Sequence, residues 1–395
     1  MSAPKTKQGT NLEDVQEMNR SLVIRLIRKR QVCSRAELAQ ASGLNQSTIT
    51  NIINEFLSWG LVVETGMIDG KKGRRSIGIQ LNSELYKIIG IKLAHKSISA
   101  GLYDLAGNEY SHQQITIANR DSAATAFKNM KKLITEMIQL QAGRVIAIGI
   151  ATPDPLFRNE DRMDRIRPWW ETMNIQENVR NEFGIPVYIE HDAKAAALAH
   201  WWFDGPRLDQ GVLIYAAAGQ GVRAGIVIDG KVFRGSLGMA GEMGHMSIDY
   251  KGPDCECGHK GCLELYCSTS ALLKMLNKDH ATLKSVWKDL KDRDSLTEEA
   301  VHKVAWFLGF GLVNLVNLYN PDCIILGGEL SAAGDPFVDT VKRVIMEHVR
   351  SDVSSELTIS LSALEQDDIL IGAATIAMDS LLEQPSSYFA FSKTE

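Results

Sequence analysis

The feature that most constrains the fold is a long alternation of strand-like and helix-like segments, which begins near Tyr86 and continues almost to the end of the chain. The apolar runs "RVIAIGIATP" and "CIILGG" are predicted to be buried strands, and "AATAFKNMKKLITEMIQLQ" carries apolar residues at helical spacing. Repeated units of this kind indicate an α/β body with helices covering the sheets, in two lobes. Ligands of such folds bind at strand ends, where "IEHDAK" and "LGGEL" fall.

Residues 1–82 follow a different pattern, which is typical of a winged helix-turn-helix. Ser34 and Glu37 form a capping box at a helix start, Gly43 provides a tight turn, and Asn45 caps the next helix. Two strands around a Gly-rich basic tip then form the wing. The first helix is predicted from Val15, Met18, Leu22, Val23, Leu26 and Ile27, and the last helix from Ile49, Ile52, Ile53, Phe56 and Leu57.

This predicted head carries the residue types that contact DNA. Residues 1–80 hold 12 Lys and Arg against 7 Asp and Glu, whereas the whole chain holds 43 against 48. Short polar side chains at the start of the second helix can reach base edges or phosphates, although they would also make an ordinary solvated first turn. The predicted DNA contacts are Arg35, Asn45, Gln46, Ser47, Thr48, Thr50 and Asn51 on the helices, and Lys72, Arg74 and Arg75 on the wing.

Three cysteines lie in the short polar run "CECGHKGC", which we interpret as part of a metal site. Cys255, Cys257 and Cys262 need one more ligand to complete a tetrahedron, and His245 lies shortly before them. His259, inside the run, is the competing fourth ligand. A redox pair would favour C-x-x-C at a helix start, and a disulfide is not expected in a cytosolic chain.

Composition favours a soluble, cytoplasmic protein. The N-terminus lacks the apolar core of a signal peptide, and no apolar run approaches the ~20 residues that a membrane helix needs. We therefore expect no membrane insertion.

Four motifs, "EHDAKAAALA", "GEMGH", "CECGHKGCLE" and "LGGEL", resemble the ROK family of bacterial sugar kinases and transcriptional repressors. The resemblance implies an actin-like, hexokinase-like body over residues 83–380, and the head resembles that of the repressor branch. It also implies that His245 and the three cysteines hold structural zinc. The residues implied to contact the sugar are Asp192, Glu242, His245 and Glu264, of which Asp192 matches the general base of the kinases.

The loops that would bind ATP depart from the family pattern. In the family, the first phosphate loop resembles D-x-G-G-T. This chain has "GIKLAHKS" at that place, with Lys92 where the acid would be. "GQGVRAG" stands where G-T-G-I-G-x-G is expected, so that Gln220 replaces a threonine and Arg223 a glycine, and Glu329 follows "GG" where a third glycine is usual. Phosphoryl transfer requires close backbone approach to the phosphates and an acid that manages magnesium. We therefore predict no ATP binding and no kinase activity.

The residues around the implied sugar site agree only in part with the kinase pattern. The four implied sugar residues stand, but other positions depart from the kinases, namely Asp154, His191, Lys194 and the segment "RIRPWWETMN" with Trp169 and Trp170. The alternative is that the carboxylates only orient the zinc loop.

The sequence thus predicts a repressor of carbohydrate-use genes, a homodimer or tetramer that binds operator DNA and a sugar or sugar derivative. A divergent sugar kinase and a regulator whose signal is a partner protein, such as a sugar-transport component, are the alternatives. Residues 381–395 are expected to form a C-terminal tail that could dock on a neighbour.

Overall fold

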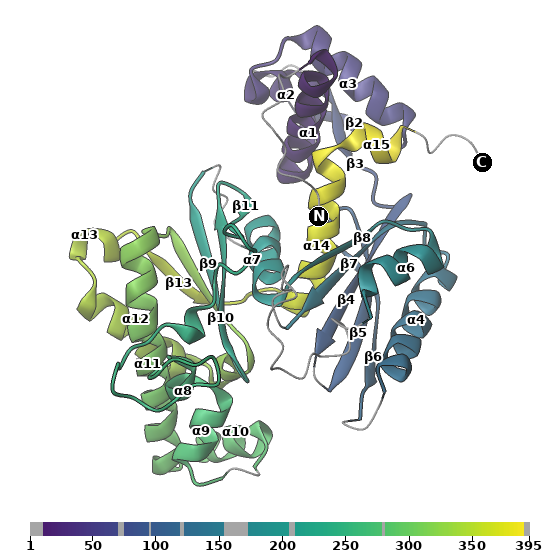
Figure 1. The fold of residues 1–395 in the computed structure, drawn as a ribbon. Helices are drawn as coiled ribbons and strands as arrows, with labels where there is room; N and C mark the ends of the chain where they lie inside the picture. Colours follow the sequence, from purple (N-terminus) through teal and green to yellow (C-terminus); the bar gives the residue numbers. More distant parts are fainter. Residues whose placement is uncertain are drawn as a thin grey trace. The chain divides into compact units, whose positions relative to one another are not determined.

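The computed structural model describes residues 11–69, 75–94, 96–118, 122–153, 173–204, 210–278 and 281–390. The chain divides into two compact units (Figure 1). The first unit comprises Met1–Ile150, Arg167–Ile189 and Ala373–Glu395, and the second comprises Ala151–Ile166 and Glu190–Gly372. The predicted boundaries at residues 82/83 and 380/381 are not the boundaries of these units, and they stay a prediction about the head and the family body.

The head forms the start of the first unit and has the predicted winged helix-turn-helix elements. Ser34 accepts a hydrogen bond from the Glu37 backbone amide while Glu37 caps Ser34 in return. Gly43 adopts a left-handed conformation with φ of 70°, and Asn45 accepts from the Thr48 amide. The elements are α1 (Leu12–Arg30), β1 (Cys33–Ser34), α2 (Arg35–Ser42), α3 (Gln46–Ser58), β2 (Val62–Asp69) and β3 (Arg75–Leu81). The strands pair antiparallel in the order β1-β3-β2.

The core of the head contains the predicted stripe of α3 but only part of the predicted stripe of α1. Ile49, Ile53 and Phe56 are fully buried, as are Val23 and Ile27. Three other apolar residues from which this helix was predicted are exposed, namely Val15, Met18 and Leu22. The apolar positions of α1 form two stripes, and only one of them packs onto α2 and α3.

The rest of the first unit is a sheet in the order β6-β5-β4-β7-β8. Its strands are β4 (Tyr86–Ala94), β5 (Ser97–Asp104), β6 (Glu109–Thr116), β7 (Arg144–Thr152) and β8 (Val187–His191). Apolar residues of β4, β5 and β7 form one core with α4 (Ala123–Gln139) and α6 (Ile175–Phe183). This is the predicted α/β arrangement, with helices packed on a sheet.

The second unit is built on a sheet in the order β11-β10-β9-β12-β13. Its strands are β9 (Val212–Ala218), β10 (Val222–Ile228), β11 (Lys231–Val232), β12 (Cys323–Gly327) and β13 (Thr358–Leu361). The pairs β9–β12 and β12–β13 are parallel, whereas β9–β10 and β10–β11 are antiparallel. The helical elements are α7 (Asp192–Phe203), η1 (Met243–His245), α8 (Glu264–Cys267), α9 (Thr269–Met275), α10 (Leu283–Lys291), α11 (Ser295–Tyr319), η2 (Glu329–Ala333), α12 (Asp335–His348) and α13 (Ser351–Ser354).

The helix α11 is long and apolar enough to cross a membrane by length and composition, but more than half of its most apolar window is buried. Val304, Leu308 and Leu312 of this helix belong to the core of the second unit. We therefore interpret α11 as a core helix.

The last helices run from the second unit into the first. The helix α14 (Asp368–Glu383) has its first residues in the second unit and joins the first unit at Ala373. The short helix α15 (Pro385–Phe389) follows it, with Pro385 and Phe389 buried. Residues 381–390 of the expected tail are therefore folded against the first unit, where the Phe389 ring lies 5.1 Å from that of Tyr86. Residues 391–395 lie outside the described part.

Candidate metal and sugar site

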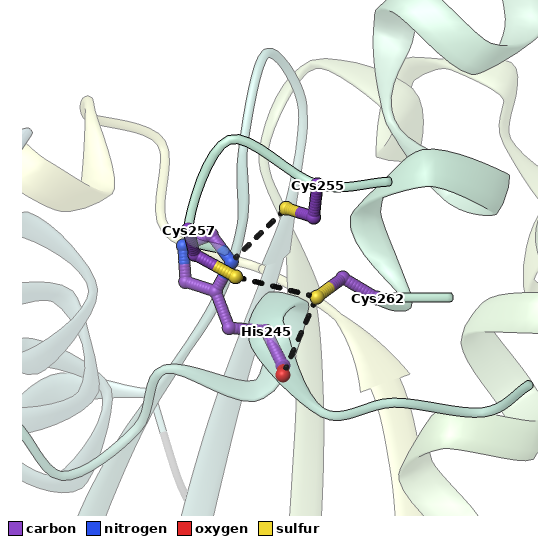
Figure 2. A group of neighbouring side chains, drawn as sticks. All are labelled: His245, Cys255, Cys257 and Cys262. Carbon is purple, nitrogen blue, oxygen red and sulfur yellow. Dashed lines mark hydrogen bonds between the residues drawn. The ribbon is translucent and has the colours of Figure 1, made fainter. Parts of the chain in front are cut away.

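The three cysteines of the polar run and His245 come together in the second unit (Figure 2). One ligand atom from each of His245, Cys255, Cys257 and Cys262 lies within 4.8 Å of the other three. The Sγ atoms of Cys257 and Cys262 are 3.5 Å apart, and Cys255 Sγ is 3.8 Å from His245 Nδ1. Around a zinc ion with Zn–S bonds of about 2.3 Å, ligand atoms lie about 3.8 Å apart. The donor set and its spacing therefore fit a closed tetrahedral metal site.

Two glycines make this loop possible. Gly258 and Gly261 have φ of 92° and 63°, a conformation that other residues rarely adopt. A Cβ on Gly261 would lie 1.8 Å from the carbonyl oxygen of Asp249, so a side chain has no room there. The loop turns tightly at both glycines and returns so that Cys262 pairs with Ser247, two residues after His245.

Glu264 lies against the metal cluster. Its Oε1 atom is 3.2 Å from His245 Nδ1 and accepts from Cys255 Sγ at 3.4 Å. Its position on the first turn of α8, two residues after Cys262, holds it there. This contact favours the alternative that the sequence left open for Glu264, a carboxylate that orients the metal ligands.

A second group of charged residues surrounds Asp192, the first residue of α7. Arg223 on β10 reaches it with Nη1, 3.2 Å from Asp192 Oδ2. Burial raises the pKa of Glu242, while the charges of Arg223, Lys194 and His245 act in the opposite direction. Glu242 therefore shares one electrostatic environment with these groups, and the structure gathers the four predicted sugar residues in the second unit.

Two departures from the kinase pattern are buried beside Asp192. His191 is 3% exposed, and burial together with the charges of Arg223 and Lys194 lowers its pKa to about 3. The imidazole is therefore neutral at physiological pH and offers one donor and one acceptor. Lys194 is fully buried, donates to the Gly238 carbonyl at 2.6 Å, and has its pKa lowered by burial. Asp154, Trp169 and Trp170 lie outside the described residues.

Charged side chains occupy the glycine loop that would receive a nucleotide. A Cβ on Gly221 would lie 3.1 Å from the Arg223 guanidinium, and one on Gly219 would lie 3.5 Å from the Glu329 carboxylate. Glu329 is fixed there by a hydrogen bond from Thr269 Oγ1 at 3.1 Å. In the first unit, Lys92 lies on β4, at the position where the family's first phosphate loop is expected to carry an acid.

The predicted DNA contacts are partly free and partly engaged within the head. Gln46, Ser47, Thr50 and Asn51 are exposed at the start of α3, and Arg75 is exposed at the start of β3. Asn45 caps α3, where Thr48 is half-buried, and the Thr50 hydroxyl donates to the Gln46 carbonyl. Arg35 forms an ion pair with Glu64 at 2.9 Å. Lys72 and Arg74 lie outside the described residues.

Comparison with known proteins decides the family. The model of the ROK family matches residues 88–380. The chain belongs to the ROK family.

Two ROK relatives match nearly the whole chain. The xylose repressor of Caldicellulosiruptor bescii is 30% identical over 393 residues, covering 94% of this chain and 98% of the relative. The Escherichia coli DNA-binding transcriptional dual regulator NagC is 26% identical, covering 94% of this chain and 95% of the relative, and a protein named the N-acetylglucosamine repressor in Shigella flexneri matches with the same identity and coverage.

Solved ROK structures separate the head from the body. A ROK family transcriptional regulator, a homologue of the Escherichia coli MLC protein, is 25% identical with a TM-score of 0.78, covering 94% of this chain and 97% of its own. The ROK hexokinase of Thermus thermophilus is also 25% identical, with a TM-score of 0.61, but it covers 75% of this chain and 99% of its own. The regulator thus matches the chain at nearly full length, whereas the hexokinase matches only a part the size of the family body.

Proposed function

We propose that this ROK protein is a transcriptional repressor that binds operator DNA through its head and a sugar through a non-catalytic site in its body. The observation that carries the proposal is the combination of a winged helix-turn-helix with a ROK body in which Asp192, the residue that matches the general base of the kinases, is ion-paired with Arg223. Relatives named as xylose and N-acetylglucosamine repressors support this function over nearly the full length of the chain.

The ion pair argues against phosphoryl transfer. A general base must be free to accept the proton of the attacking hydroxyl, and a fixed guanidinium lowers its basicity. The Glu329 carboxylate beside Gly219 would also repel the phosphates of a nucleotide. We therefore propose that the protein has no kinase activity. An assay of ADP release with D-xylose, D-glucose and N-acetylglucosamine tests this, and sugar-dependent ADP release above background would refute it.

The proposed sugar residues are Asp192, Glu242, His245 and Glu264. Carboxylates bind sugar hydroxyls through charge-assisted hydrogen bonds, and Glu242 Oε1 is buried with no hydrogen-bond partner among the described residues. A buried acceptor without a partner is costly, and a ligand hydroxyl would satisfy it. We propose D-xylose as the first sugar to test, because of the names of the relatives, and N-acetylglucosamine as the second.

We also propose that zinc occupies the cluster of His245, Cys255, Cys257 and Cys262, with His245 rather than His259 as the fourth ligand. Zinc bound by four protein ligands would stabilise the loop and supply no open coordination position for catalysis. Glu264 contacts this cluster and is also a proposed sugar residue, so loss of the metal would disturb both the loop and sugar binding.

The remaining proposals concern assembly and location. A two-fold dimer, alone or within a tetramer, would match a palindromic operator, and a repressor must reach DNA in the cytoplasm.

A thermal-shift measurement on the full chain tests whether the protein binds a sugar. A ligand at about a hundred times its Kd adds ~2.7 kcal/mol of stability. A shift with D-xylose that is lost in Glu242→Gln supports the proposal. The absence of a shift with any sugar contradicts it and favours a protein partner as the signal.

A further inference from the structure

The first helix of the head leaves an apolar stripe uncovered. Leu12, Val15, Met18 and Leu22 are 74%, 43%, 66% and 40% exposed. Three other apolar residues of the same helix, Val23, Ile24 and Ile27, are fully buried in the head. A large apolar stripe on an otherwise polar surface marks an interaction site.

The other sides of α1 are already occupied. Val23, Ile24 and Ile27 form the core side. Glu17 and Arg25 face the C-terminal helices, where Glu17 accepts from the Ser386 amide and Arg25 pairs with Asp379. At 100° per residue, the uncovered stripe lies on a third side, between these two.

A line of residues through this stripe is symmetric about its centre. Its members follow one another at spacings of three and four residues, which places them in one line along a helix. They are Leu12, Val15, Asn19, Leu22 and Leu26, of which Asn19 and Leu26 are half-buried, and the exposed Met18 lies beside this line. Counted from Asn19, Leu12 and Leu26 are equally distant, and Val15 and Leu22 are nearly so. When two identical helices cross antiparallel at Asn19, apolar residues therefore meet apolar residues, and one carboxamide meets the other.

The charges of α1 favour the same orientation. Its first turn is acidic, with Glu13 and Asp14, and its last turn is basic, with Arg28, Lys29 and Arg30. An antiparallel pair places each acidic end beside the partner's basic end, whereas a parallel pair would place like charges together. Arg30, the last residue of the helix, is an exposed basic group at this end.

The sequences at the two ends of the chain do not match the stripe. Residues 1–10, "MSAPKTKQGT", have Met1 as their only large apolar residue. The last five residues, "FSKTE", have only one, Phe391. Neither segment carries a row of apolar side chains that could match the four exposed residues.

We infer that the stripe is the surface through which two copies of the head pair, antiparallel and centred on Asn19. The contact is isologous, so that Leu12 lies near the partner's Leu26 and Asn19 lies near its own copy. This goes beyond the proposed function, which requires two heads at a fixed spacing but does not say what holds them together. Pairing through α1 would set the distance between the two copies of α3.

Cross-linking of the full chain tests the orientation. One preparation carries Leu12→Cys and another Leu26→Cys, and the two are mixed and treated with a thiol cross-linker that spans about 10 Å. Because the two positions are about 21 Å apart along one helix, a linker of this length distinguishes antiparallel from parallel pairs. We expect the mixed product to exceed the products of either variant alone, as identified by mass spectrometry of the linked peptides. Leu318→Cys on α11, where Leu318 is 73% exposed, is the matched control and should form no product with either variant.

Two results would overturn the inference: products that join Leu12→Cys to itself, or no mixed product with or without duplex DNA. A second measurement uses a duplex that the wild-type protein selects from a randomised library. Leu22→Glu should weaken its binding by about ten-fold or more, because each copy would bury a charge against the partner's Val15, whereas Leu318→Glu should bind as the wild type does. Unchanged binding by Leu22→Glu also contradicts the pairing. If the wild type selects no duplex, the DNA-binding function fails, but the cross-linking result still decides the pairing.

Discussion

Arg25 on α1 forms an ion pair with Asp379 on α14, with Nη1 and Oδ1 2.5 Å apart. A second nitrogen of the same guanidinium donates to the Asp379 carbonyl oxygen at 3.2 Å. Three residues past the end of α14, the Ser386 amide donates to Glu17, also on α1. The C-terminal helices therefore hold the DNA-binding head by the same helix that carries the uncovered stripe.

The ion pair predicts a specific loss of stability. Replacing Asp379 by Asn removes the charge but keeps the shape, and because the pair is partly shielded from solvent, we expect a cost of about 1 kcal/mol. Urea unfolding followed by circular dichroism measures it. Asp352→Asn is the matched control, because its pair with Arg350 is fully solvated and should contribute little. Equal stability losses in the two variants would contradict this role of Asp379.

The metal cluster predicts that one thiol is indispensable. Cys257→Ser should lose zinc, as measured by atomic absorption on the purified protein, and should unfold at a lower temperature, because the remaining ligands no longer close a tetrahedron. Cys323→Ser, on the buried strand β12, is the control that should lose stability yet keep its zinc. A fully zinc-loaded Cys257→Ser protein would show that the cluster does not bind metal as proposed.

The buried His191 predicts a dependence of stability on acid. Its folded pKa of about 3 lies below its ordinary value of 6.5, so that below pH 6.5 the unfolded chain takes up a proton that the folded chain does not. Stability should therefore fall as the pH drops from 6.5 toward 3, by up to about 1.4 kcal/mol per pH unit from this group. Unfolding curves at pH 7.0, 6.0 and 5.0 should be less pH-dependent for His191→Asn than for the wild type. His302→Asn, on α11, is the control for the replacement of a histidine elsewhere in the chain, and a wild-type slope in His191→Asn would count against the assignment.

The carboxylate cluster predicts which substitution weakens sugar binding without loss of metal. Glu242→Gln removes a buried charged acceptor, and we expect the Kd for the sugar to rise about ten-fold or more, because hydrogen bonds to charged groups contribute about 1.5–3 kcal/mol. Isothermal titration calorimetry gives the Kd, and zinc content should remain at the wild-type level. An unchanged Kd would remove Glu242 from the site.

Local rules predicted the head and the metal loop well. The capping box of Ser34 and Glu37, the left-handed Gly43 and the turns at Gly258 and Gly261 depend on a few neighbouring residues, which the sequence displays directly. The spacing of the cysteines similarly predicted a cluster with His245.

Features that depend on which surfaces pack against one another were harder to predict from the sequence. Apolar periodicity placed Val15, Met18 and Leu22 on a predicted helix, but periodicity cannot tell a buried stripe from one that is exposed in a single chain. The polar character of "EQPSSYFAF" suggested a tail, yet Phe389 packs on Tyr86. The sequence showed Arg223 as a bulky replacement for glycine, but only the structure shows that it pairs with Asp192, 31 residues away.

The most direct test of the central claim is the affinity of the full-length protein for its selected DNA duplex, measured by fluorescence anisotropy at fixed salt with and without saturating D-xylose or N-acetylglucosamine. For a sugar-controlled repressor, one of these sugars should change the Kd for DNA by about five-fold or more in the wild type, and the change should shrink in Glu242→Gln at the same sugar concentration. Tight DNA binding that neither these nor any other sugar alters would contradict the account.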